Sequence, residues 1–287
     1  MKYNPKLTAT DEYYFSKFIR NMAARKYSES SLRSYTTHLK AIKESLNKRN
    51  LSLSDLSPAV MEEVTEDWKE VAKNTHNMRV TTISNLFEYL KSIEKADKNP
   101  VSSHNYLRVE KYQKQPPTDK EVEKIVKETR KYSPEIEFGI ALMTYAGLRV
   151  SELENIVFSS LTDNENYTSL MIHAKKYEKT RIVIIYNEYA RNLIKRQLEI
   201  NKLLDCSIVF PSRNYFNMIL RKIGEKHGFS YSCHDLRRYY ATSLAKKGVP
   251  VPLIAKVLGH ESIATTQRYL FINYADVFSF FDTFGAN

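Results

Sequence analysis

Apolar residues recur every three or four positions through most of this chain, which is the periodicity of helices with one buried side. The clearest stripe is Leu32, Tyr35, Leu39, Ile42 and Leu46. Residue pairs typical of helix starts precede several stripes, such as Thr10 before Asp11 and Ser57 before Pro58. Other helix starts are predicted at or near Thr118, Ser133, Glu188, Asn214, Asp235, Val251 and Ala264. The fold is therefore predicted to be mainly α-helical.

Two segments interrupt this helical pattern. Between Ser169 and Tyr186, two short β-rich runs flank a charged turn from Lys175 to Arg181, which predicts a β-hairpin. Residues 99–117 contain Asn99-Pro100 and Pro116-Pro117, and their apolar residues follow no sustained periodicity. This pattern predicts an extended linker. We therefore expect an N-terminal helical bundle over residues 1–98, a linker over 99–117 and a mostly helical second domain over 118–287.

The charge balance favours a polyanionic partner. The chain has 44 Lys and Arg against 33 Asp and Glu, with 20 basic and 14 acidic residues in positions 1–115. Both halves are basic, so a partner that contacts both is the simplest expectation. The longest stretch without a charged side chain, residues 138–148, is too short to span a bilayer. Cys206 and Cys233 are too few for a disulfide framework. These features predict a soluble, intracellular protein.

Two local motifs carry residues suited to phosphate chemistry. The first is Tyr-Ala-Gly-Leu-Arg-Val-Ser-Glu-Leu, in which Gly147 ends a helix and Arg149 lies in the corner before Glu152. The second places His234 and Arg237 one helical turn apart, followed by Leu258-Gly259-His260 and then Tyr269. Each motif alone is compatible with an ordinary helix–turn–helix packing contact or with a polar helix surface. Their combination and order are more specific.

Between about Pro117 and Phe271, this combination resembles the tyrosine recombinases, also called phage-integrase-type site-specific recombinases. The resemblance lies in the order Arg149, a hairpin lysine, His234-x-x-Arg237, Leu-Gly-His260 and Tyr269, with nine residues from His260 to Tyr269. It implies that residues 1–98 are a SAM-like core-binding domain and that 118–287 are the catalytic domain. Together they would form a C-shaped DNA clamp.

The resemblance also implies roles for the motif residues. Tyr269 would attack a DNA phosphodiester, forming a 3′-phosphotyrosyl bond and releasing a 5′-hydroxyl, with His234 as general base. Arg149 and Arg237 would bind the non-bridging oxygens, because guanidinium groups form forked hydrogen bonds with phosphate. His260 would donate a hydrogen bond to the phosphate, and Glu152 would orient the arginine or a neighbouring base.

The hairpin lysine is the general acid for the leaving 5′-oxygen in this family. Counting back from Arg181 selects Lys176, but the neighbouring Lys175 remains an alternative. The family usually has glycines around this lysine, whereas this chain has Ala174, Lys175 and Tyr177. No metal or other cofactor is expected, because the carboxylate cluster of a Mg²⁺ site is absent from the sequence and the phosphotyrosyl bond conserves the energy for religation.

The expected partner is double-stranded DNA with a specific recombination site. Residues expected to contact the DNA backbone are Arg25, Lys26, Arg33, Lys40, Lys43 and Lys175. Residues 271–287 are rich in phenylalanine, and the resemblance suggests that this segment docks on a neighbouring protomer in a tetramer on two duplexes; packing on its own domain is the alternative. No membrane association is expected, and the predicted location is the cytoplasm, on the nucleoid.

Several functions fit these residues. The leading one is a Xer-type resolvase that converts chromosome dimers to monomers, because no arm-binding domain precedes the bundle. The second is the integrase or excisionase of a mobile element. More remote alternatives are a type IB topoisomerase, which relaxes supercoils without a specific site, and a DNA-binding module without catalysis.

Overall fold

The computed structural model describes residues 2–110, 114–174, 179–204, 208–260, 262–267 and 270. The chain divides into two compact units, Met1–Lys111 and Tyr112–Asn287, which we call the first and second units. The division falls inside the segment predicted as a linker.

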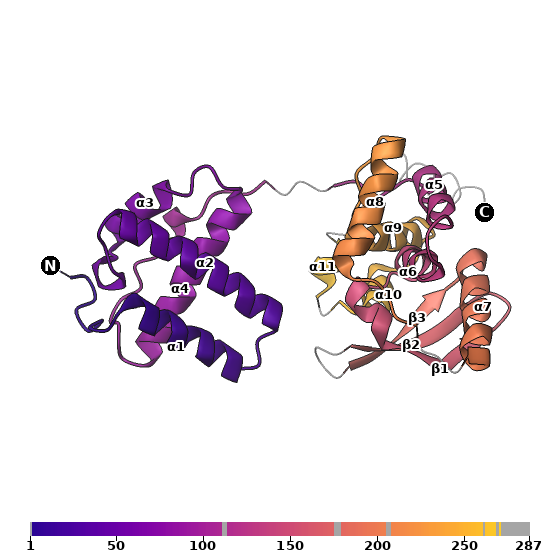
Figure 1. The fold of residues 1–287 in the computed structure, drawn as a ribbon, viewed down its shortest axis with the longest axis horizontal. Helices are drawn as coiled ribbons and strands as arrows, with labels where there is room; N and C mark the ends of the chain where they lie inside the picture. Colours follow the sequence, from indigo (N-terminus) through magenta and orange to yellow (C-terminus); the bar gives the residue numbers. More distant parts are fainter. Residues whose placement is uncertain are drawn as a thin grey trace. The chain divides into compact units, whose positions relative to one another are not determined.

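The first unit is a helical bundle (Figure 1). Its elements are α1 (Asp11–Ala24), α2 (Glu29–Lys48), η1 (Leu53–Asp55), α3 (Pro58–Glu66), α4 (Lys73–Ser92) and η2 (Ser103–Asn105). The two predicted helix starts are confirmed, because the Thr10 side chain accepts the Tyr13 amide and Ser57 accepts that of Val60. The apolar stripe of α2 faces the core through its buried side chains Leu39, Ile42 and Leu46.

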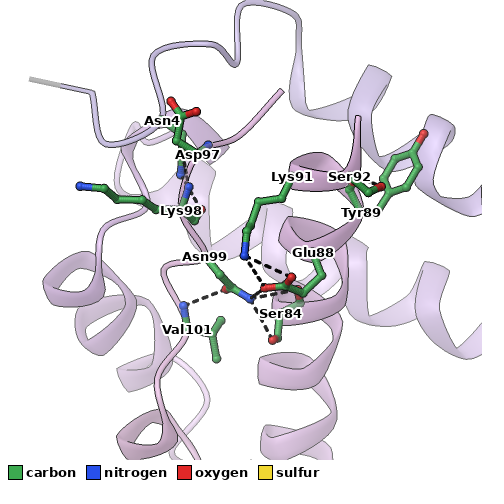
Figure 2. A network of polar contacts seen from close by, with 10 residues as sticks. All are labelled: Asn4, Ser84, Glu88, Tyr89, Lys91, Ser92, Asp97, Lys98, Asn99 and Val101. Atoms are coloured by element: carbon green, nitrogen blue, oxygen red, sulfur yellow. Dashed lines mark hydrogen bonds and ion pairs between the residues drawn. The ribbon is translucent and has the colours of Figure 1, made fainter. Parts of the chain in front are cut away.

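Asparagine side chains attach the ends of the first unit to its helices (Figure 2). The amide of Asn99 donates to Ser84 and to Oε1 of Glu88 on α4, the latter over 2.9 Å, and its Oδ1 accepts the Val101 amide. Oδ1 of Asn4 accepts the backbone amides of residues 97 and 98 over 3.1 and 3.2 Å. The first part of the predicted linker is therefore hydrogen-bonded to the bundle.

The second unit consists of helices packed against a small sheet (Figure 1). Its helices are α5 (Asp119–Thr129), α6 (Pro134–Tyr145), η3 (Val150–Asn155), α7 (Glu188–Leu204), α8 (Arg213–His227), α9 (Cys233–Lys246), α10 (Val251–Leu258) and α11 (Ile263–Gln267). Most begin at or next to a predicted start, and α9 begins two residues before one, at Cys233. The core is formed by apolar side chains of α5, α6, α7, α8, α9 and the sheet.

The sheet is larger than the predicted hairpin. β2 (Thr168–Ala174) and β3 (Lys179–Ile185) pair antiparallel as expected, and β1 (Ile156–Asp163) adds a third antiparallel strand beside β2. The register between β1 and β2 shifts between Val157 and Thr162. Such a bulge interrupts the alternation of apolar and polar residues by which a strand is identified in a sequence.

Among the helices in the part of the chain that the structure describes, none combines the length and the apolar character needed to span a membrane.

Candidate active site

The site begins where α6 ends. Gly147 has a φ of +64°, which glycine adopts without the strain that a Cβ imposes, and η3 begins three residues later. Arg149 caps η3: its backbone amide donates to Oε2 of Glu152 over 2.7 Å, and its Nη1 donates to Oε1 over 2.8 Å. The predicted helix stop at Gly147 is confirmed, and Arg149 forms an ion pair with Glu152.

Glu152 is a buried carboxylate shared by three arginines. Besides Arg149, Nη2 of Arg181 lies 2.7 Å from Oε2, and Nη1 of Arg237 lies 3.5 Å from the same oxygen. Burial by itself raises the pKa of Glu152, but the charges of Arg181 and Arg237 and the Arg149 amide outweigh it, so the pKa lies below its ordinary value. Glu152 is therefore ionised at neutral pH and holds the three guanidinium groups together.

Arg237 is buried at the centre of this cluster, with only 1% of its side chain exposed. Its Nη1 donates to the carbonyl of Gly147, and its Nη2 donates to the carbonyl of Leu258. The same Nη2 lies 3.1 Å from Nε2 of His260. Arg237 on α9 thus joins the end of α6 to the end of α10, which are separated by more than a hundred residues.

His260 follows α10 and lies between Arg237 and α11. Its Nδ1 is 2.8 Å from Oγ1 of Thr266, which is fully buried. Burial and the charges of Arg237 and Arg149 lower the pKa of His260 to about 3. The imidazole is therefore neutral at physiological pH, and both of its nitrogens have a protein partner.

His234 lies one turn before Arg237 at the start of α9 and is exposed. Partial loss of solvent around the ring lowers its pKa below the ordinary value, and the positive charge of Arg237 lowers it further. A neutral, accessible imidazole at pH 7 is suited to accept a proton.

Arg181 is a member of the cluster that was not predicted. It lies on β3 with its side chain 10% exposed, and besides Glu152 it donates to the carbonyl of Val257. The sequence does contain a signal for it. Arg181, Val183 and Ile185 alternate along the strand, so an arginine shares a face with two fully buried residues. A buried arginine requires an acidic partner, which Glu152 supplies.

The remaining predicted site residues either are not described by the structure or belong to the first unit. Lys175, Lys176, Tyr269 and the segment 271–287 lie outside the described residues. The predicted DNA contacts Arg25, Lys26, Arg33, Lys40 and Lys43 belong to the first unit.

The basic residues of the first unit differ in their availability. Arg25, Lys26 and Lys40 are exposed at the end of α1 and on α2. Arg33 is exposed and pairs with Glu29 over 2.9 Å. Lys43 is more enclosed, with its Nζ 3.1 Å from Asp11 and 3.2 Å from Glu12. A phosphate contact by Lys43 would therefore compete with two carboxylates.

The cluster as a whole is suited to bind an anion. Three guanidinium groups surround one carboxylate, which leaves net positive charge, and the Arg149 side chain is 38% exposed. Hydrogen-bond donors fixed in place before a reaction stabilise charge that develops in its transition state. Arg149 is therefore the most accessible of these three arginines, and Glu152 holds all three in place.

The close packing around Gly147 gives a test of this corner. A Cβ at position 147 would lie 2.4 Å from Cδ1 of Tyr240 and 2.9 Å from Cδ2 of Leu258. We expect Gly147→Ala to lower the free energy of unfolding by roughly 2–4 kcal/mol, because strain from a positive φ adds to overpacking. Thermal melting of the full chain measures this loss.

Gly228→Ala is the matched control. Gly228 ends α8 with a φ of +77°, but nothing lies within 4 Å of its hypothetical Cβ. Gly228→Ala should lower the free energy of unfolding only through backbone strain, by about 1 kcal/mol. Equal losses in the two variants would contradict the close packing of Gly147 against Tyr240.

Comparisons with known proteins identify the family of the chain. The phage integrase family matches residues 118–275, more than half of the chain, and the phage integrase N-terminal SAM-like domain matches residues 15–94. The chain is 27% identical to the tyrosine recombinase XerD of Rickettsia bellii, over 89% of this chain and 93% of that protein.

Solved structures share the fold. The XerH site-specific recombinase bound to palindromic difH substrate matches with a TM-score of 0.71 at 20% identity, over 86% of this chain and 77% of that chain. A lambda integrase tetramer bound to a Holliday junction matches with a TM-score of 0.71 at 18% identity, over 92% and 78%. With the matches of both family domains, these findings establish that the chain belongs to the phage integrase family and is a tyrosine recombinase, an enzyme that cleaves and rejoins DNA.

Proposed function

We propose that this protein is a site-specific recombinase of Xer type, which exchanges strands between two copies of one DNA site during the resolution of chromosome dimers. Similarity to XerD along nearly the whole of both chains supports this role. The fold shared with lambda integrase makes integration or excision of a mobile element the second candidate.

The observation that carries the proposal is the assembly of Arg149, Glu152, Arg237 and His260 in one cluster. These residues come from the start of η3, from α9 and from the segment after α10, and they are connected by hydrogen bonds and ion pairs. A conventional salt bridge would not need three arginines on one buried carboxylate. A phosphodiester in the transition state of cleavage, which gains negative charge, does need fixed cations.

In the proposed mechanism, the Tyr269 oxygen attacks the scissile phosphorus and displaces the 5′-oxygen. Arg149 and Arg237 stabilise the non-bridging oxygens, Arg149 through its exposed guanidinium. His234 accepts the phenol proton, because its lowered pKa keeps it neutral at pH 7. Attack by the freed 5′-hydroxyl of the partner strand then restores a phosphodiester and releases the phenol. Each step breaks one phosphoester bond and forms another, so their number is unchanged.

Lys176 is proposed as the acid that protonates the leaving 5′-oxygen, with Lys175 as the alternative. We expect the alanine variant of the true acid to cleave normal DNA slowly and to recover on DNA with sulfur at the 5′ bridging position. A thiolate leaves without protonation because the pKa of a thiol is far below that of an alcohol. Single-turnover cleavage of both substrates by Lys175→Ala and Lys176→Ala measures this rescue. Rescue of Lys175→Ala alone would transfer the role to Lys175.

We also propose that both units contact the duplex and that four protomers act together on two sites. The positive charge on both halves of the chain supports the first point. The phenylalanine-rich segment 271–287 is the proposed link between protomers. The DNA contacts of the first unit would involve the exposed side chains Arg25, Lys26 and Lys40.

Covalent capture on the protein's own genome separates the two biological roles. Wild-type protein is incubated with sheared genomic DNA, and the fragments that remain covalently attached are sequenced. A Xer-type enzyme should recover one chromosomal site, outside any mobile element. Recovery of the ends of an integrated element would instead establish the integrase role, and adducts without a common sequence would contradict site-specific recombination.

A further inference from the structure

Thr266 is a buried polar residue with a defined contact inside the candidate site. It lies on α11, is fully buried, and its Oγ1 is 2.8 Å from Nδ1 of His260. In the sequence it precedes Tyr269 by three residues. A buried hydroxyl needs a hydrogen-bond partner, and the partner of Thr266 is Nδ1 of His260. The other ring nitrogen of His260 contacts Arg237.

The two contacts of the His260 ring, with Arg237 and with Thr266, together determine the position of its proton. A guanidinium has five N–H donors and no acceptor, so Nε2 of His260 must accept from Nη2 of Arg237 across the 3.1 Å contact. A neutral imidazole carries one proton, which must then be on Nδ1. Nδ1–H donates to Oγ1 of Thr266, and the hydroxyl oxygen acts as the acceptor. The low pKa of His260 agrees with this neutral form.

We propose that Thr266 is a positioning residue, which fixes the Nδ1–H tautomer of His260 and thereby keeps a lone pair on Nε2 directed at Arg237. The resulting chain of contacts runs from Thr266 through His260 and Arg237 to Glu152. It connects the segment that leads to Tyr269 with the carboxylate that binds Arg149. The inference rests on the proposed function, in which Arg149 and Arg237 stabilise the phosphate.

Two substitutions separate this role from simple packing. Thr266→Val keeps the shape and volume of the side chain but removes the acceptor, whereas Thr266→Ser keeps the acceptor and removes a methyl group. A packing role predicts that serine is the more harmful change, because it leaves a cavity. The positioning role predicts the opposite order, with serine preserving activity and valine reducing it.

The tautomer is measured directly by long-range ¹H–¹⁵N NMR on full-length protein labelled with ¹⁵N-histidine, with His260 assigned by comparison with His260→Gln. At pH 7, the wild type and Thr266→Ser should show protonated Nδ1 and unprotonated Nε2. Thr266→Val should lose this single tautomer, because one of the two contacts that together favour it is removed. A wild-type spectrum with the proton on Nε2, or with both nitrogens protonated, would overturn the inference without any variant.

Activity provides the second measurement. In single-turnover formation of the covalent DNA adduct, we expect Thr266→Val to be slower by roughly tenfold, the value of one hydrogen bond, and Thr266→Ser to remain near the wild-type rate. Equal rates for valine and wild type, or a slower serine variant, would contradict the positioning role. If wild-type protein forms no adduct, the proposed function fails, while the NMR spectrum still decides the tautomer.

Discussion

Replacing Tyr269 by phenylalanine is expected to abolish covalent attachment to DNA and to leave DNA affinity nearly unchanged. Phenylalanine keeps the ring but lacks the oxygen that we propose as the nucleophile. Water and the remaining side chains cannot form the same intermediate, so the expected loss is complete rather than partial. The measurement is denaturing electrophoresis of a nicked suicide duplex, in which the cleaved strand stays attached to the protein, together with a native gel for binding.

A second tyrosine provides the control for this result. Tyr132 lies in the second unit between α5 and α6 and is 36% exposed, so Tyr132→Phe also removes one accessible hydroxyl. It should form adduct at the wild-type rate. Adduct formation by Tyr269→Phe would show that another residue of this tyrosine-rich chain is the nucleophile.

Removing either of the two candidate phosphate-binding arginines should slow cleavage strongly, but with different effects on stability. Arg149→Ala and Arg237→Ala are each expected to reduce single-turnover cleavage by about 10²–10³-fold, the usual effect of removing a fixed donor to a developing anion. Rapid-quench measurement of adduct formation under saturating protein gives these rates.

The stability of the two variants distinguishes their places in the cluster. The Arg149 side chain is 38% exposed, and Glu152 keeps Arg181 and Arg237 in its absence, so Arg149→Ala should change the free energy of unfolding by about 1 kcal/mol or less. Arg237→Ala leaves the carbonyls of Gly147 and Leu258 and Nε2 of His260 without their buried donor. Arg237→Ala should therefore lower the free energy of unfolding by about 3–5 kcal/mol.

Thermal melting tests this difference. A melting temperature for Arg237→Ala equal to that of Arg149→Ala would show that Arg237 is not the buried centre of the cluster. Arg237→Lys serves as a further comparison, because lysine keeps the positive charge but cannot donate to two carbonyls from a planar fork. It should remain strongly impaired in cleavage.

Most helices could be predicted from the sequence because their signals are local. Thr10, Ser57 and Thr118 cap helices with side chains that bind amides three residues later, and this requires no tertiary contact. β1 was missed although its partner β2 follows it after a turn of only four residues. The register shift after Val157 obscures the alternation of apolar and polar residues by which β1 would have been identified.

The site was predictable in its residue types and only partly in its contacts. Arg149, Glu152, His234, Arg237 and His260 were found through their spacing and their resemblance to a known family. The spacing does not indicate that Arg237 is buried, because burial depends on three segments that meet only in the folded chain. The participation of Arg181 and Thr266 depends on the same tertiary packing.

The central claim is that a cationic cluster activates a phosphodiester for attack by one particular phenol. The most direct measurement is mass-spectrometric mapping of the wild-type adduct trapped on a suicide duplex. We predict a nucleotide attached through its 3′-phosphate to the peptide that contains Tyr269. Attachment to any other residue, a 5′-phosphate linkage, or no adduct from protein that binds the duplex would contradict the account.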